Sequence, residues 1–170
     1  MARVLMVIAP AVFRDEEYEH PKEVLEARGA TVVTVSRSAG TCTGKLGATA
    51  EATLALADAT AADYDAVIFV GGGGAETYFD DPVAHNLART ADALGRVVAA
   101  ICIAPSILAR AGLLRGVKVT AFGSQEDDLR RHGARWTGAP VQVDGRIITA
   151  NGPAAARDFG VAIADALGLP

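Results

Sequence analysis

Short runs of β-branched and apolar residues alternate along the chain with longer stretches of helical period. The runs predict strands at residues 4–9, 31–36, 67–70, 97–101 and 117–121. The stretches rich in Ala, Leu, Glu and Arg predict helices at residues 16–28, 82–94, 105–111, 126–131 and 153–167. Three of the expected strands are continuously apolar, as happens when helices cover both faces of a sheet. The alternation is typical of β-α units around a largely parallel sheet.

Two further regions modify this picture. Residues 141–143 and 147–150 flank Asp144-Gly145, a strong signal for a two-residue hairpin turn, so we expect an antiparallel addition to the sheet. Residues 36–62 have no clear period and are interpreted as a loop with a small strand pair. Without an internal repeat or a linker, we predict one domain over residues 1–170.

Composition limits the function classes. The 170 residues are 51% hydrophobic and carry a formal charge of −4, and no block of Lys or Arg offers a phosphate backbone a binding stripe. We therefore expect no nucleic-acid partner. No apolar run approaches the roughly 20 residues of a membrane span, and the N-terminal residues lack the pattern of a secretory signal. These features predict a cytoplasmic protein without a membrane partner.

Cys102 follows an apolar strand and precedes a helix that Pro105 can begin. This is the context of a nucleophile elbow, in which a strained turn projects a side chain at the edge of the sheet. Helix N-termini favour anions and lower the pKa of a nearby cysteine, so the sequence predicts a Cys102 thiolate as the resting species. The alternative is a small buried hydrophobic residue, as most free cysteines are.

Two loops are expected at the same edge of the sheet. The turn Gly71-Gly72-Gly73-Gly74 follows the third strand and could offer backbone N–H groups to an oxyanion, or could be a tight turn without a ligand. It fits neither a dinucleotide fingerprint nor a P-loop. The loop after the first strand brings several acids, which either cap the next helix or place one carboxyl beside the sulfur.

The remaining candidates are interpreted as bystanders. Cys42 is expected in a loop without an elbow. His20, His85 and His132 form no metal-binding spacing with each other or with the cysteines, so we assign them surface or capping roles. The sequence thus predicts neither a metal nor a cofactor.

Taken together, five ordered segments resemble the ThiJ/PfpI family, and the match spans nearly the entire chain. The segments are Phe13-Arg14-Asp15-Glu16-Glu17 with Pro21, Tyr64 to Gly73, Ala99 to Pro105, Ala111 to Gly116, and Ile148 to Pro153. The resemblance implies an α/β fold: a flavodoxin-like three-layer sandwich with a mostly parallel sheet, similar to class I glutamine amidotransferases. It also implies a homodimer or a higher homo-oligomer.

The same resemblance implies site residues. Cys102 matches the family's elbow cysteine and Glu17 matches the glutamate that hydrogen-bonds it, which would make these two the catalytic residues. Gly72 and Ile103 match positions whose backbone N–H groups face the sulfur or a substrate oxyanion.

The sequence also departs from the family pattern. Protease-type members have histidine after the cysteine, where Ile103 stands, and the deglycase branch has a histidine at the position that matches Phe122. Peptidase activity is therefore not expected. The leading hypothesis is an enzyme for small reactive carbonyls, of the glyoxalase or deglycase kind. A redox-sensing or stress-protective protein that uses oxidation of Cys102 is the alternative, and a hydrolase ranks third.

Overall fold

The computed structural model covers residues 1–170 and is built around a mostly parallel sheet. Its order is β11-β12-β8-β7-β1-β3-β6, and only β11 runs antiparallel to its neighbour. The strand bounds are β1 Arg3–Val7, β3 Thr31–Ser36, β6 Leu54–Ala55, β7 Ala66–Phe69, β8 Val97–Ile101, β11 Val141–Asp144 and β12 Ile147–Ala150. The α/β fold with a largely parallel sheet is thus confirmed.

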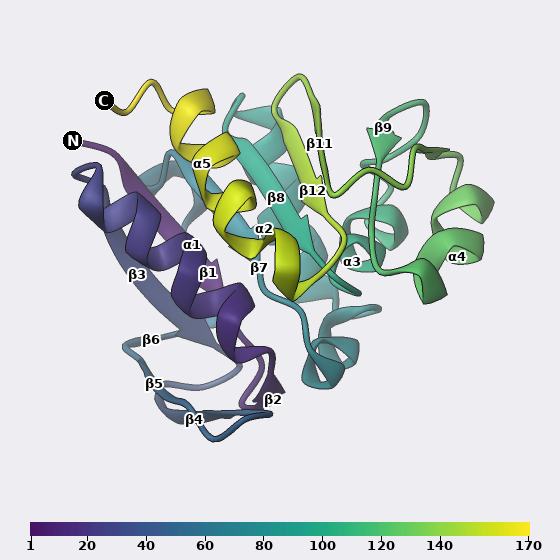
Figure 1. Cartoon of the computed structure of the whole chain (residues 1–170). Helices are drawn as coiled ribbons and strands as arrows, with labels where there is room; N and C mark the ends of the chain where they lie inside the picture. The colour runs from purple at the N-terminus through teal and green to yellow at the C-terminus, as the bar shows by residue number, and fades with distance from the viewer.

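Helices cover both faces of this sheet. Figure 1 shows α1 (Asp15–Ala27) and α5 (Ala156–Ala166) side by side on one face. On the other face, α2 (Pro82–Ala93) and α3 (Pro105–Arg110) pack near β8, and α4 (Glu126–Arg131) packs against α3. No helix combines the length and the apolarity needed to cross a bilayer.

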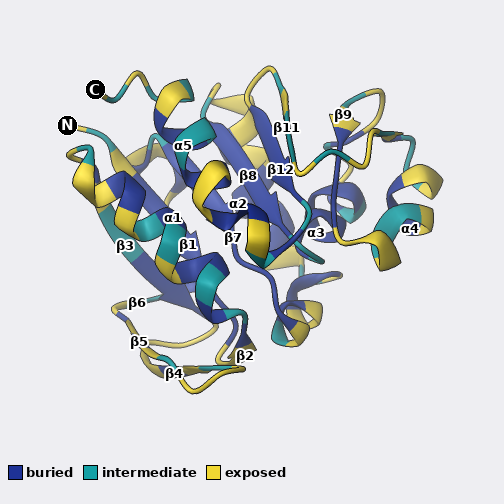
Figure 2. Cartoon of the chain, in the orientation of Figure 1, coloured by how far each residue is buried: buried dark blue, intermediate teal, exposed yellow.

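The side chains of each central strand alternate between two separate cores. In β8, Val98 and Ala100 join the core under α2 and α3, whereas Val97, Ala99 and Ile101 join the core under α1 and α5. Figure 2 shows β8 and β12 as buried throughout. Burial on both faces explains why these strands read as continuous apolar runs in the sequence.

The expected strand at residues 117–121 is wrong in extent and in place. Only Lys118–Val119 (β9) is extended, and it pairs with β10 (Arg135–Trp136) in a separate two-stranded sheet. The edge of β8 is instead occupied by β12, the second strand of the predicted hairpin. The N–H of Thr120 donates to the hydroxyl of Thr149 in β12 (3.0 Å), so a side chain takes the backbone donor that a sheet ladder would use.

Smaller differences concern the ends of elements. The first strand stops at Val7, and the last helix begins with a 3-10 turn at Pro153–Ala155. In the stretch interpreted as a loop, β4 (Gly40–Gly44) and β5 (Thr49–Ala52) form the expected strand pair, with β2 (Ala11–Phe13) beside β4. Cys42 consequently lies in a strand and is 2% exposed, which corrects its expected place in a loop.

Candidate active site

Cys102 occupies a strained turn between β8 and α3. Its φ of +64° is in the left-handed region, which a residue with a side chain adopts at a cost of about 1–3 kcal/mol. The turn is held by two backbone hydrogen bonds: the N–H of Cys102 donates to Ala150 O (2.9 Å), and the N–H of Phe122 donates to Cys102 O (2.8 Å). With Pro105 in the first turn of α3, this geometry matches the predicted elbow.

Glu17 lies across a glycine from Cys102. It is the third residue of α1 and is completely buried. A Cβ at Gly71 would be 2.3 Å from Oε1 of Glu17 and 2.6 Å from Cβ of Cys102. Only a residue without a side chain therefore fits between the carboxyl and the cysteine.

Backbone N–H groups complete the surroundings of the sulfur. Those of Gly72 and Ile103 act on Cys102 as donors that lower the pKa of its thiol. Gly72 has a φ of +93°, and a Cβ there would be 2.4 Å from the backbone nitrogen of Arg14. Because the N–H of Arg14 donates to Gly71 O (3.0 Å), the glycine turn is fixed against the segment that leads into α1.

The ionisation of the pair differs from the sequence-based expectation. Burial raises the pKa of Glu17 to about 7. Burial and the charge of Glu17 together raise the pKa of Cys102 to about 12, and the two N–H donors do not offset them. The prediction of a resting thiolate is therefore wrong while Glu17 is ionised, because two anions would share one buried site. The pair titrates as a unit and retains a proton at neutral pH.

The carboxyl oxygens of Glu17 are buried without a hydrogen bond of regular geometry, although Sγ of Cys102 and the N–H of Gly71 are near enough to lower its pKa. The neighbouring acids have partners elsewhere. Asp15 accepts hydrogen bonds from Leu46 N (2.9 Å) and Ala48 N (2.8 Å), and Glu16 binds the guanidinium of Arg14 (3.0 Å). Among these three consecutive acids, Glu17 is the one placed beside the sulfur.

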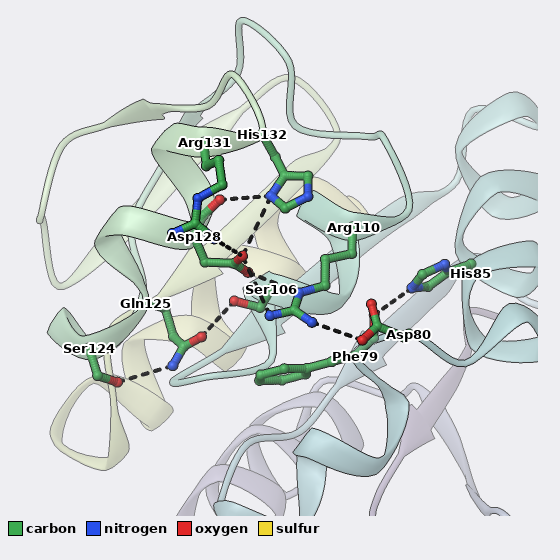
Figure 3. Close-up of polar contacts among 10 residues, drawn as sticks. All are labelled: Phe79, Asp80, His85, Ser106, Arg110, Ser124, Gln125, Asp128, Arg131 and His132. Atoms are coloured by element: carbon green, nitrogen blue, oxygen red, sulfur yellow. Dashed lines mark hydrogen bonds and ion pairs between the residues drawn. The ribbon is translucent and has the colours of Figure 1, made fainter.

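The three histidines have other partners. His85 is buried with Nε2 2.7 Å from Phe79 O, which corrects the surface or capping role expected for it. His132 ends α4, where Nδ1 lies 2.8 Å from Asp128 O (Figure 3). His20 lies within α1 and is half-buried. No group of three His, Cys, Asp or Glu side chains is arranged to hold a metal.

The polar cluster in Figure 3 connects α3 to its neighbours. Arg110 binds Asp80 (2.9 Å) and Asp128 (3.2 Å), and its guanidinium lies 5.1 Å from the ring centre of Phe79. Ser106, in the first turn of α3, donates to Oε1 of Gln125 (2.7 Å). These contacts hold the helix that follows Cys102, and we assign them a structural role.

Two features of the site were missed from the sequence. One is the side chain of Arg14, whose charge lowers the pKa of Glu17. The other is a cavity of about 390 Å³ lined by Phe122, Trp136 and Asn151 among others, next to the segments that hold the backbone of Cys102. A larger cavity of about 600 Å³ lies among Asp65, Arg96 and Arg146, which precede β7, β8 and β12 at the opposite edge of the sheet.

Comparison with known proteins identifies the family. The sequence model of the DJ-1/PfpI family matches residues 2–166. The chain belongs to this family. Among solved structures, a ThiJ/PfpI domain protein from Brachyspira murdochii has a TM-score of 0.96 and 34% identity, with 98% of this chain and 96% of that chain covered. The flavodoxin-like architecture is thereby confirmed for this DJ-1/PfpI chain.

Two curated relatives bear on activity. The uncharacterised protein MJ0967 of Methanocaldococcus jannaschii is 40% identical over 169 residues, which cover 98% of this chain and 82% of that protein. The deglycase PH1704 of Pyrococcus horikoshii is 34% identical over 142 residues, which cover 84% of this chain and 86% of that protein. The DJ-1/PfpI chain therefore has relatives named for an enzymatic activity.

Proposed function

We propose that this protein is a cysteine-dependent enzyme acting on small reactive carbonyl compounds such as methylglyoxal. The observation that carries the proposal is the placement of Cys102 and the buried carboxyl of Glu17 on either side of Gly71. A nucleophile with one carboxyl acid-base group is the minimum that rearrangement of an α-oxoaldehyde to a hydroxy acid requires. The deglycase name of a 34% identical relative agrees with this substrate class.

The reaction can be written through the two side chains. The carboxylate of Glu17 accepts the thiol proton as sulfur adds to the aldehyde carbon, and Glu17 then gives this proton to the aldehyde oxygen, which forms a hemithioacetal. Glu17, again ionised, removes the C1 proton to form an enediolate and returns it to C2. The proton on the C1 oxygen passes to the C2 oxygen in the same rearrangement, which gives a hydroxyacyl thioester of Cys102. Water hydrolyses the thioester, which releases the 2-hydroxy acid and restores the thiol. The complete reaction converts one α-oxoaldehyde and one water molecule into one 2-hydroxy acid, and it needs no oxidant or reductant.

The pKa of Glu17 suits this role. A general base works best when its pKa is close to the working pH, and burial raises the pKa of Glu17 to about 7. In the resting site the thiol keeps its proton, so Glu17 and Cys102 are not both negatively charged. Glu17 accepts the thiol proton only as the sulfur attacks the aldehyde. The N–H groups of Gly72 and Ile103 are suited to stabilise negative charge at the sulfur or at the attacked oxygen.

Turnover of methylglyoxal by purified protein tests the proposal, with the hydroxy acid measured as product. We expect Cys102→Ser to lose activity at least a hundredfold, and Glu17→Gln to lose at least tenfold because the proton carrier is removed. Cys42→Ser is the matched thiol control and is expected to retain activity if folding is unchanged. Wild-type turnover no faster than that of Cys102→Ser would refute the proposal.

Oxidation of Cys102 is the second candidate function. The two N–H donors that act on the sulfur could also hold the oxygen atoms of a sulfenic or sulfinic acid, with Glu17 as a further partner. The raised pKa of the thiol opposes this function, because the thiolate is the form that peroxide oxidises. Titration with hydrogen peroxide followed by peptide mass analysis decides the matter: a Cys102 no more oxidisable than the buried Cys42 would exclude selective sensing.

A further inference from the structure

Arg14 brings a positive charge to the active site, and the mechanism above does not use it. The residue caps the N-terminus of α1, three positions before Glu17, and its N–H donates to Gly71 O (3.0 Å). Its backbone is therefore fixed to the same glycine that separates Glu17 from Cys102. The side chain is 28% exposed and so lies at the boundary between the site and solvent.

Glu16 determines where this charge is held. Nε of Arg14 lies 3.2 and 3.3 Å from the two carboxyl oxygens of Glu16, and Nη2 lies 3.0 Å from Oε2. This forked contact restricts the guanidinium to one position. Nη1 forms no hydrogen bond, so the fork does not occupy the entire guanidinium.

The charges around the pair come from one short segment. Arg14, Glu16 and Glu17 all belong to the start of α1, while the glycine turn and the elbow contribute backbone N–H groups. Asp15 is directed at the β4–β5 turn. The guanidinium of Arg14 lowers the pKa of Glu17, the charge of Glu16 raises it, and the charge of Cys102 raises the pKa of Arg14.

We propose that Arg14 is a positioning residue whose guanidinium, fixed by Glu16, stabilises the negative charge of the Cys102–Glu17 pair in a site without an imidazole. Ile103 and Phe122 occupy the positions at which protease-type and deglycase-branch members of the family have histidine. None of the three histidines of this chain has a partner in the site. The inference rests on the proposed function for its catalytic meaning. Its effect on the thiol can be measured without any substrate.

The competing explanation is an ion pair that only stabilises the start of α1. That role would affect folding and leave the ionisation of Cys102 unchanged. Replacing the side chain of Arg14 separates the two explanations, because the hydrogen bond to Gly71 comes from the backbone and remains.

The experiment measures the alkylation rate of Cys102 by iodoacetamide from pH 5 to 10, with the modified peptide quantified by mass spectrometry. This range contains the first deprotonation of the coupled Cys102–Glu17 pair, near the Glu17 pKa of about 7, and the pH midpoint of alkylation reports this shared step. Arg14→Gln, Arg14→Met and Arg14→Lys are compared with wild type. Arg37→Gln is the matched control, because Arg37 is also a partly exposed arginine with a carboxylate partner, Asp81, and acts on neither member of the pair. Thermal melting checks that each variant is folded.

Removing a positive charge disfavours the anion, so Arg14→Gln is expected to raise the pH midpoint of alkylation by about 0.5 to 1 unit. Arg14→Met should raise the midpoint by a similar amount, Arg14→Lys should keep it close to the wild-type value, and Arg37→Gln should leave it unchanged. High salt should reduce these differences, since the guanidinium is partly exposed.

A midpoint that stays at the wild-type value in folded Arg14→Gln, or moves equally in Arg37→Gln, overturns the inference. If Arg14→Gln does not fold, Arg14→Met decides, because methionine keeps an apolar stem without the charge: a midpoint that does not rise also overturns the inference. Methylglyoxal turnover is measured on the same samples. A shifted midpoint without turnover would refute the proposed function alone, whereas turnover with an unshifted midpoint would refute the role of Arg14 alone.

Discussion

At the scale of single residues, the burial of Glu17 determines the chemistry of the site. A carboxyl that is fully buried and lacks a regular hydrogen bond keeps its proton to an unusually high pH. The same carboxylate, once ionised, raises the pKa of Cys102. The two residues therefore exchange one proton, and neither can be assigned a charge without the other.

This coupling makes the stability of the protein depend on pH. The pKa of Glu17 is 4.5 in a reference state and about 7 in the fold, so the folded protein binds the extra proton between these values. Stability is fully present below pH 4.5 and falls as the pH rises through 7. We expect Glu17→Gln, which carries no charge, to match wild type near pH 4.5 and to be about 3 kcal/mol more stable at pH 8.

Urea unfolding of both proteins from pH 4.5 to 8 provides the measurement. Glu16→Gln is the control without this dependence, because Arg14 lowers the pKa of Glu16 and the contribution of Glu16 is lost only as the pH falls below 4.5. A difference between wild type and Glu17→Gln that stays constant across this range would contradict the assignment.

The sequence indicated which residues come together beside Cys102, but it did not indicate their ionisation. An apolar strand followed by a cysteine and then a proline indicated the elbow at Cys102. The resemblance to the family selected Glu17 from several acids. The thiolate expectation was wrong because it counted the donors at a helix N-terminus and omitted burial and the adjacent carboxylate. Those two terms depend on packing between segments about 85 residues apart, as read from the numbers of Glu17 and Cys102.

At the scale of elements, the glycine turn after β7 is explained by close packing. Two interpretations were open from the sequence, a ligand-binding turn and a tight turn. The structure shows why side chains are excluded: a Cβ at Gly71 would meet Glu17 and Cys102, and one at Gly74 would be 2.0 Å from Ala11 O. The glycine turn therefore packs directly against the loop after β1, the start of α1 and the elbow at Cys102, at the carboxyl edge of the sheet.

Gly71→Ala is expected to destabilise the fold by about 1–3 kcal/mol, because its new methyl group must displace the carboxyl of Glu17 or the backbone of Ile101 at 2.7 Å. Urea unfolding measures the loss, and the alkylation midpoint of Cys102 should also change. Gly123→Ala is the matched control, since nothing lies within 4 Å of a Cβ there and its φ is not positive. Equal stability of the two variants would rule out the proposed packing role.

The error over residues 117–121 has a similar origin. Apolar composition correctly indicated burial, and Val119 and Ala121 are buried. It could not indicate which strand would occupy the edge of β8, since that depends on the hairpin that follows 20 residues later. Pairing partners are a property of the assembled sheet, and local pattern carries little information about them.

At the scale of the whole molecule, the site draws on segments from most of the chain. Glu17 comes from α1, the glycine turn follows β7, Cys102 follows β8, and the carbonyl that holds its backbone belongs to β12. The order of β-α units predicted that these ends would meet at one edge of the sheet. The homo-oligomer implied by the resemblance stays a prediction.

The contact between α1 and α5 has a consequence for synthesis of the protein. Gly160 of α5 lies so close to α1 that a Cβ there would be 2.8 Å from Cα of Pro21. Both α5 and the carbonyl of Ala150 follow Cys102 in the chain and therefore leave the ribosome after it. A nascent chain that has released Cys102 but not residue 150 therefore lacks the carbonyl that holds the backbone of Cys102 and the helix that packs on α1, so the strained turn is completed only after β12 and α5 have been synthesised.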